Sequence, residues 1–441
     1  MRKLILLLAL ALLLCICADG ATKIGLDRLN WSQSVDGIKF SGTAPASTAG
    51  VLYNDSGTLK FNGSNISFSD CDVLISLESD GIRAYASNGS ILANDVSAPY
   101  DFGQVFNDVM NATGAGQKVS LDGEFAYTTS AILLNHTEVC GIGNSSLSTA
   151  DDVPAFTTAN DTYIREHITI EHLNIFYTDT SYCSVPQIAI YNPLSCTLKD
   201  LKVLCTAVSS YSASHNGGIY LYGYHPYTWL NKIEDCTVSR LALLKITDST
   251  IKNVASNTYG KGPHAIKLNG ACNNVKIIGC EIVCDKVAGI YISNECWHLQ
   301  IKDNYFEAHM HTPTPGNIET GIHFATANKY AEIEGNHFSY INGYGIYYVG
   351  NYGVIANNIF ENCNVGDNSY DDIAITSGDT NMIHGNIGTR AYGETNKGYL
   401  ADDTNYNIFY NNHAKGDLYL GCVDAGANSL NQDNVAWPGT P

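Results

Sequence analysis

The 441-residue sequence has little charge, little arginine and no long apolar segment. Charged residues make up 15% of the chain and only six are arginines, so there is no basic stripe of the kind that binds nucleic acid. The leucine-rich run Leu4–Leu14 is too short to cross a membrane as a helix, and we expect no transmembrane anchor. Helix-length apolar repeats are also missing, which makes helical and leucine-rich repeat folds poor fits.

Signatures of metals and cofactors are scarce as well. No Cys-x-x-C occurs, which disfavours a structural zinc site. His309 and His311 have no third ligand nearby, so we interpret them as polar surface. The 43 acidic and 24 basic residues give a net charge of −19, which disfavours an anionic polysaccharide unless a cation such as Ca²⁺ bridges the two. We predict no metal site and no cofactor.

A repeated phrase, Ile-x-x-Asn-x-Phe, fills the second half of the chain. Its fourth position holds Asn304, Asn336, Asn358, Asn386 and Asn411, and further upstream Cys280, Ser249, Cys236, Leu201 and Leu173. Its last position holds Phe306, Phe338 and Phe360. Asn tolerates the left-handed backbone region, so it can form a bend that turns both the Ile and the Phe inward. We predict a column of stacked asparagines and an inward ladder of phenylalanines.

A second phrase, Gly-Ile-aromatic-apolar, alternates with the first. Its Ile residues at positions 266, 290, 322, 346 and 373 are separated by 24, 32, 24 and 27 residues. Apolar and polar residues alternate within both phrases, which predicts two short strands in each repeat. Short strands that recur at a regular spacing indicate a solenoid.

The two phrases resemble the coils of the right-handed, single-stranded parallel β-helix proteins of the pectate-lyase superfamily, in which asparagines stack at one bend. The resemblance covers residues 99–441 and implies an all-β fold. It includes a short capping helix near residues 101–112, with Asp101 and Gln104 as its N-terminal cap. The arginine and histidine segments of the superfamily's lyases and polygalacturonases are absent, so the fold by itself does not imply their activity.

The first 98 residues differ from the repeat region. Residues 1–20 have the pattern of a signal peptide, with Arg2 and Lys3 before a leucine-rich core and small residues near Ala18. Residues 21–98 are rich in Ser, Thr, Gly and Asn and contain strand-like pieces, which predicts a small β-rich stem. We therefore expect a secreted protein located outside the cell or at its surface.

Sequons for N-glycosylation are confined to the first 162 residues. They start at Asn30, Asn54, Asn62, Asn65, Asn88, Asn111, Asn135, Asn144 and Asn160. The rest of the chain is rich in asparagine but contains no sequon, which favours a glycosylated N-terminal part over a coincidence of composition. The sequon-free remainder is free to bind a partner or to self-associate.

The chain has 14 cysteines, which can pair in an exported protein. Cys236 and Cys280 occupy the asparagine position of the repeat, and we expect them to be buried thiols. Six other cysteines are candidates for disulfides between neighbouring coils: Cys183, Cys196, Cys205, Cys272, Cys284 and Cys296.

In the second phrase, the residue after Ile points outward and so contributes to a surface. Three tyrosines on this surface are candidates for stacking on sugar rings: Tyr220, Tyr291 and Tyr347. Candidates for acid–base catalysis lie on or beside it: His323, Glu319, Lys267, His264 and Asp371. The alternative is a solvated strand surface whose aromatic ladder only stabilises the sheet.

Three functions fit these features. The first is a surface protein that binds a polysaccharide or cell-surface glycan, neutral or weakly charged, and that can also cleave it as a polysaccharide lyase or glycoside hydrolase. The second is a structural surface-layer or fibre protein. The third is an adhesin or a virus-like receptor-binding spike without catalytic activity. A glycan array distinguishes the second from the other two.

Overall fold

The computed structural model describes most of the chain from residue 71 onward and three short strands before it. The described residues are 52–55, 58–61, 64–65, 71–178, 183, 185–205, 218–224, 228–257, 264–284, 287–308, 320–363, 370–389, 401–402, 406–416, 423–424 and 430–438. The chain forms two compact units, residues 1–73 with 85–92 and residues 74–84 with 93–441. In the first unit, an antiparallel sheet consists of β1 (Leu52–Asp55), β2 (Thr58–Phe61) and β3 (Ser64–Asn65). The signal peptide lies outside the described residues, and the domain limits at residues 20 and 98 stay predictions.

A single described helix, α2 (Phe102–Thr113), forms where the sequence predicts a capping helix. It is preceded in the sequence by β4 (Val73–Glu78), β5 (Gly81–Ala86) and β6 (Ile91–Asp95). The side chain of Asp101 accepts a hydrogen bond from the Gly103 backbone N–H at 3.1 Å, which confirms the N-cap. Gln104 donates to Asp108 at 2.9 Å instead of completing the expected capping box. The buried side of the helix consists of Phe102, Gly103, Val105, Phe106, Val109 and Met110.

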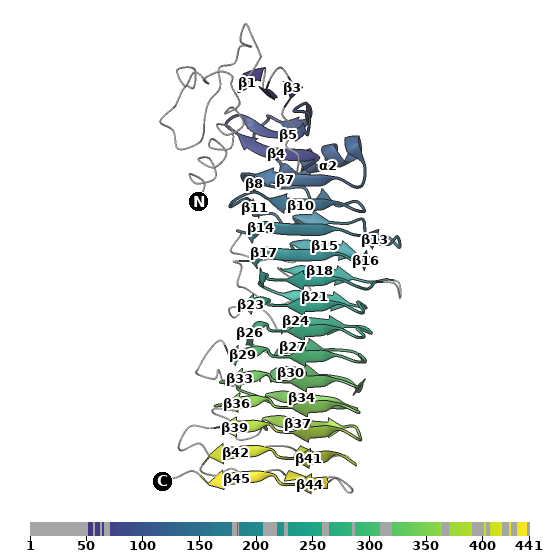
Figure 1. The fold of residues 1–441 in the computed structure, drawn as a ribbon, viewed down its shortest axis with the longest axis vertical. Helices are drawn as coiled ribbons and strands as arrows, with labels where there is room; N and C mark the ends of the chain where they lie inside the picture. The colour runs from purple at the N-terminus through teal and green to yellow at the C-terminus, as the bar shows by residue number, and fades with distance from the viewer. Residues whose placement is uncertain are drawn as a thin grey trace, which may run out of the picture. The chain divides into compact units, whose positions relative to one another are not determined.

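From residue 118 the chain winds into a right-handed parallel β-helix, as the sequence predicts (Figure 1). One complete coil contains β28 (Gln300–Lys302), β29 (Tyr305–Ala308) and β30 (Thr320–Phe324). The expectation of two strands per repeat is wrong, because the asparagine phrase bends in its middle and forms β28 and β29. Each strand pairs in parallel with its counterparts in the neighbouring coils, so stacking produces three ladders of strands.

The first and second ladders belong to one large sheet, and two long strands run through both of them, β14 (Thr169–Tyr177) and β17 (Thr197–Cys205). The first ladder also contains β7 (Lys118–Asp122), β10 (Glu138–Gly141), β19 (Lys232–Glu234), β22 (Thr250–Lys252), β25 (Lys276–Ile278), β28, β32 (Glu332–Glu334), β35 (Val354–Ala356), β38 (Met382–His384), β41 (Ile408–Tyr410) and β44 (Leu430–Gln432). The second ladder also contains β8 (Glu124–Ala126), β11 (Ser146–Thr149), β20 (Thr237–Val238), β23 (Ala255–Asn257), β26 (Glu281–Cys284), β29, β33 (His337–Ser339), β36 (Ile359–Glu361), β39 (Ile387–Thr389), β42 (His413–Gly416) and β45 (Val435–Pro438).

The third ladder forms a separate sheet and carries the Gly-Ile phrase. It contains β9 (Ala131–Ile132), β12 (Phe156–Thr157), β15 (Ile188–Tyr191), β18 (Ile219–Tyr222), β21 (Leu241–Leu244), β24 (His264–Asn269), β27 (Ala288–Ile292), β30, β34 (Ile346–Asn351), β37 (Ile373–Ser377), β40 (Ala401–Asp402) and β43 (Val423–Asp424). Outside this order, β31 (Asn328–Lys329) pairs with β34, and β13 (Arg165–Glu166) pairs with β16 (Pro193–Leu194).

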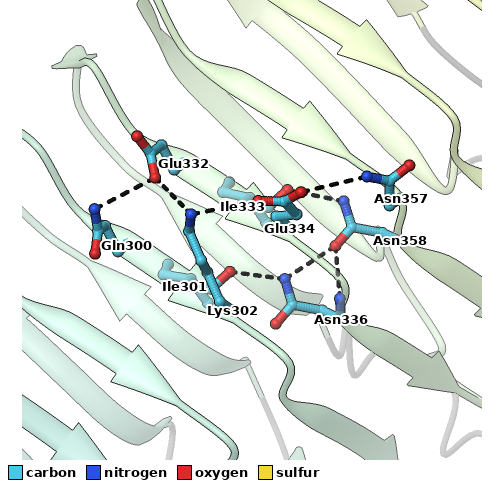
Figure 2. Close-up of polar contacts among 9 residues, drawn as sticks. All are labelled: Gln300, Ile301, Lys302, Glu332, Ile333, Glu334, Asn336, Asn357 and Asn358. Carbon is cyan, nitrogen blue, oxygen red and sulfur yellow. Dashed lines mark hydrogen bonds and ion pairs between the residues drawn. The ribbon is translucent and has the colours of Figure 1, made fainter.

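The bend between the first two ladders holds the predicted asparagine column. The Asn336 Nδ2 donates to Asn358 Oδ1 at 2.9 Å and to the Ile301 carbonyl at 2.8 Å (Figure 2). Equivalent amide-to-amide bonds connect Asn304, Asn336, Asn358, Asn386, Asn412 and Asn434. The column is therefore confirmed, and it continues for two coils beyond Asn386. Stacking satisfies amide groups that the core would otherwise leave without partners.

Two assignments to this column are wrong, and so is the expected backbone of the bend. Asn412 enters the column in place of Asn411, and Val254 occupies it in place of Ser249, which lies before β22 at the other end of that strand. The left-handed residue is not the column residue itself but the one before it, as at Asn357 with φ of 56°. The strand direction changes at that preceding residue, so the column side chain already points inward.

Phenylalanines fill the core as predicted. The Phe306 and Phe338 rings stack with centroids 4.6 Å apart, and the Phe338 and Phe360 rings with centroids 4.8 Å apart. All three side chains are fully buried. The rings also explain the glycine of the second phrase, because a Cβ on Gly345 would lie 2.4 Å from a Phe360 ring carbon.

Candidate functional site

The outward side chains of the third ladder form the surface that the sequence singles out, which we call the third-ladder face. Its in-register positions are Tyr220, Ala242, Lys267, Tyr291, His323, Tyr347 and Ala374. The Ile residues before them, such as Ile290 and Ile322, are fully buried, because side chains alternate along a strand. Tyr220 is only 6% exposed, so it does not offer its ring to a ligand as expected.

One end of the third-ladder face is basic. Burial and the nearby Arg240 guanidinium lower the pKa of Lys267. Lys267 forms no ion pair with any residue in the described part of the chain. A cation that is partly buried beside a second cation is unfavourable until an anion compensates it. The sequence gives little sign of Arg240, because it replaces the glycine of the second phrase in a degenerate repeat, directly before Leu241.

His264 lies beside Lys267 on the same strand. Burial, followed by the charges of Lys267 and Arg240, lowers the pKa of His264 to about 3, so its imidazole is neutral near pH 7. Its Nδ1 is buried and has no hydrogen-bond partner among the described residues. A neutral imidazole of this kind can donate or accept one hydrogen bond from a ligand, but it cannot act as a protonated acid near neutral pH.

The middle of the face is a stack of rings. Tyr291 stacks on His264 with centroids 4.1 Å apart and an angle of 7°, and it contacts His323 at 5.3 Å on its other side. His323 in turn stacks on Tyr347 at 4.8 Å. Because both faces of the Tyr291 ring are covered, this tyrosine presents its edge and hydroxyl to a ligand rather than a flat surface. Burial lowers the pKa of His323, which keeps its imidazole neutral.

The other end of the face is aromatic and acidic. Tyr344 contacts Tyr347 at 5.1 Å and Tyr370 at 5.0 Å, and burial followed by the charge of Asp371 raises the pKa of Tyr344. Asp371 precedes β37, which is four strands along the ladder from the β24 strand of Lys267. Four parallel spacings of about 4.8 Å amount to roughly 19 Å. Asp371 and Lys267 are therefore too far apart to act on one bond.

The compact part of the predicted site is thus His264, Lys267 and His323. Glu319, the predicted acid, lies outside the described residues, as do His309 and His311. The described residues contain no cluster of three His, Cys, Asp or Glu side chains that could hold a metal ion. None of the helices described here is long and apolar enough to cross a membrane.

A lysine on the first ladder provides a comparison for Lys267. The Lys302 Nζ lies 2.7 Å from Glu332 Oε2 and 3.3 Å from Glu334 Oε2 (Figure 2). The hydrogen bond to Glu332 raises the pKa of Lys302. This cation is compensated by its own chain and requires no ligand.

A surface groove of about 470 Å³ lies over the bend of β14 and β17, outside the third-ladder face. Its lining includes His172 and Asp200, whose Nδ1 and Oδ2 atoms lie 2.7 Å apart. Both side chains are exposed and paired with each other, so the groove is an open polar surface.

Four of the predicted glycosylation sites have exposed side chains: Asn88, Asn111, Asn144 and Asn160. Asn135 is partly buried, its Oδ1 has no partner within the described structure, and Thr137 of the same sequon is fully buried. Asn160 Oδ1 accepts a hydrogen bond from the Tyr224 hydroxyl at 2.8 Å. The side chains of Asn30, Asn54, Asn62 and Asn65 lie outside the described residues.

Comparison with known proteins supports the fold. Residues 110–314, under half of the chain, match a family model described as periplasmic copper-binding protein (NosD). A DFA-IIIase from Arthrobacter chlorophenolicus A6, without its lid and in complex with GF2, is 14% identical, covers 82% of this chain and 94% of its own, and has a TM-score of 0.51. No curated protein sequence matches.

Two further solved structures are similar at lower TM-scores. The A-module of mannuronan C-5 epimerase AlgE4 from Azotobacter vinelandii is 12% identical, covers 75% of this chain and 94% of its own, and has a TM-score of 0.43. PfbA, a surface adhesin of Streptococcus pneumoniae, is 14% identical, covers 75% of this chain and 90% of its own, and has a TM-score of 0.45. The parallel ladders and the likeness to the DFA-IIIase together show that the chain has a right-handed parallel β-helix fold. At these identities the likeness concerns the fold and not the activity.

Proposed function

We propose that the protein is exported and binds an acidic polysaccharide on the third-ladder face, with a sugar carboxylate at Lys267. The observation that supports this most is the state of Lys267, a partly buried cation beside Arg240 without an ion-pair partner in the described part of the chain. A carboxylate beside Lys267 would compensate the charge of this lysine. The ligand thus differs from the neutral glycan expected from the net charge, because binding depends on the local field.

The neighbouring groups suit a sugar chain that lies along the face. The Tyr291 and Tyr347 hydroxyls and the buried Nδ1 of His264 would hydrogen-bond to sugar hydroxyls or ring oxygens. Because the rings stack on one another, we assign these tyrosines to hydrogen bonding rather than to stacking on the sugar. The predicted signal peptide supports export.

If the bound glycan is also cleaved, we propose β-elimination. His323 is neutral and would accept the proton from the carbon next to the carboxylate, while Lys267 would stabilise the charge that develops on the carboxylate. The electron pair of the broken C–H bond would form a C=C bond to the adjacent carbon as its glycosidic C–O bond breaks, and the leaving oxygen would take a proton from water. Hydrolysis would instead use two carboxyl groups, typically about 5–9.5 Å apart. Asp371 is roughly 19 Å along the ladder from Lys267, so it cannot complete such a pair at this site.

A glycan array that contains uronate-bearing and neutral oligosaccharides tests the proposal. We expect the wild-type protein to bind uronate-bearing glycans and Lys267→Gln to lose them. Lys302→Gln, which also removes one positive charge, should bind like wild type. Binding of neutral glycans alone, or equal binding by both variants, would reject a carboxylate at Lys267.

A second candidate is a structural protein or adhesin without a glycan ligand. The C-terminal coils favour it, because outward positions of the first ladder become apolar at Met382, Ile408 and Leu430, which are 38%, 36% and 52% exposed. Exposed apolar residues in a row indicate protein contacts. An empty glycan array together with self-association in solution would support this candidate.

We propose N-glycosylation at the exposed sequons, and peptide mapping of native protein should find glycan at one or more of Asn88, Asn111, Asn144 and Asn160.

Copper binding, which the matched family model names, is not proposed, because the described residues bring no three suitable ligands together.

A further inference from the structure

Two pairs of cysteines lie side by side in neighbouring coils. Cys272 and Cys296 each stand two residues before a left-handed residue, Asn274 with φ of 53° and His298 with φ of 54°. The Asn274 N–H donates to the Trp297 carbonyl at 2.7 Å, which fixes the two coils in register at this corner. Both thiols are fully buried. The two cysteines therefore occupy equivalent positions, one above the other.

The Cys272 and Cys296 side chains are in contact. Cys296 Sγ lies 3.5 Å from the Gly270 carbonyl in the coil of Cys272, and the two thiols are near enough to shift each other's pKa. Equivalent positions of adjacent parallel strands are about 4.8 Å apart. This spacing falls within the range of about 4.4–6.8 Å between the Cα atoms of a disulfide. The coil geometry therefore suits a disulfide without movement of the backbone.

Cys183 and Cys205 form the second pair. Cys183 is 5% exposed and packs against Tyr177, which is the in-register neighbour of Cys205. Cys205 packs against the same cluster, and its thiol is near enough to raise the pKa of Cys183. This pair also connects consecutive coils, through β14 and β17.

Cys236 and Cys280 provide an internal contrast. Both are buried in the column at the bend, but Val254 occupies the coil between them. Two coil spacings place their Cα atoms about 9.6 Å apart, beyond the limit of about 7 Å for a disulfide. The coil that lies between Cys236 and Cys280 therefore excludes a disulfide between them.

We propose that Cys272 and Cys296, and Cys183 and Cys205, are two disulfide cross-links between consecutive coils, and that Cys236 and Cys280 stay thiols. In each cross-link two thiols lose two protons and two electrons to a disulfide-bonded oxidant, which leaves as its dithiol. Four of the six cysteines that the sequence left open to pairing are thereby assigned. The cross-links do not depend on the proposed glycan.

Peptide mapping of the full-length protein, secreted and purified without reductant, tests the cross-links. Free thiols are blocked with N-ethylmaleimide under denaturing conditions before digestion with trypsin. We expect a linked pair of peptides, residues 268–276 with 287–302, that separates only after reduction. A second link should connect residues 166–199 to residues 203–232, with Cys183 rather than Cys196 as the attachment. Cys236 and Cys280 should carry the label.

Label on both Cys272 and Cys296 before reduction would overturn the first cross-link, and label on both Cys183 and Cys205 the second. Links between any other cysteines would overturn the assignment as well. In Cys272→Ser, Cys296 should become labelled while the Cys183 link persists. Cys236→Ala should retain both links. If Cys272→Ser does not fold, the map of the wild-type protein still decides the question.

Discussion

Lys267 and Lys302 show how differently two faces of one β-helix treat a positive charge. Lys302 on the first ladder sits between two carboxylates, and the hydrogen bond to Glu332 raises its pKa. Lys267 on the third ladder has no ion pair among the described residues, and burial and Arg240 lower its pKa. The first lysine completes a surface network, whereas the second leaves a charge for a ligand to compensate.

The buried amides of the asparagine column and the buried imidazole on the third-ladder face differ in whether they have hydrogen-bond partners. The column amide of Asn336 donates to two acceptors, and its Oδ1 accepts from Asn304. The Nδ1 of His264 is equally shielded from water but has no partner within the described structure. The paired column amides hold the coils together, whereas the unpaired Nδ1 of His264 can take a hydrogen bond from a ligand.

The largest effect should come from the core. Phe338→Ala removes a ring that stacks on Phe306 and Phe360, and we expect it to lower the free energy of unfolding by about 3–5 kcal/mol. Urea denaturation measures this change. His337→Ala, on the outward side of the same strand, is the control. Equal stability of the two variants would contradict the inward ladder.

The asparagine column should come next. Asn336→Ala removes the oxygen that accepts from the Asn304 backbone N–H and side-chain amide, and the amide that donates to the Ile301 carbonyl, which should cost about 3 kcal/mol. Gln300→Ala removes an amide from the outward face of the neighbouring coil and should change stability by about 0.5 kcal/mol or less. If Asn336→Ala has the same free energy of unfolding as the wild-type protein in this assay, the column contributes nothing to stability.

The depressed pKa of His264 predicts a dependence of stability on pH. Between pH 6.5 and 3 the unfolded state binds a proton that the folded state excludes, so this stability is present above pH 6.5 and is lost as the pH falls. From pH 7.5 to 5 the loss should reach about 2 kcal/mol. His264→Phe, which retains a ring against Tyr291, should reduce the difference. An identical pH profile in the variant would contradict the assignment.

The smallest effects should distinguish the two lysines. Lys302→Gln should cost about 0–1 kcal/mol, because it breaks exposed ion pairs. Lys267→Gln should leave stability unchanged or raise it slightly, since it removes an uncompensated cation. Thermal unfolding in low salt, where charge effects are largest, measures both. A larger loss for Lys267→Gln would indicate a structural partner and would weaken the proposed site.

The repeated phrases predicted the β-helix, the asparagine column and the phenylalanine ladder, because all three depend on local alternation of side chains. The column was misassigned at Ser249 and Asn411, where apolar and polar residues fit either of two registers. Only the pairing between coils resolves such a choice.

The candidate site was predicted in part. The register of Lys267, Tyr291, His323 and Tyr347 follows from the second phrase. The sequence could not reveal that the rings cover one another, because ring orientation depends on packing between coils. It did not reveal Arg240 either, because the repeat at residues 240–243 lacks the glycine and the aromatic residue that define the second phrase.

Titration calorimetry with a uronate-bearing oligosaccharide found on the array tests the central claim most directly. Lys267→Gln should weaken binding at least tenfold, which corresponds to about 1.4 kcal/mol, while its melting temperature stays at the wild-type value. Lys302→Gln should bind within about twofold of wild type, since it lies outside the face. Unchanged affinity in Lys267→Gln, or equal losses in both variants, would contradict the account.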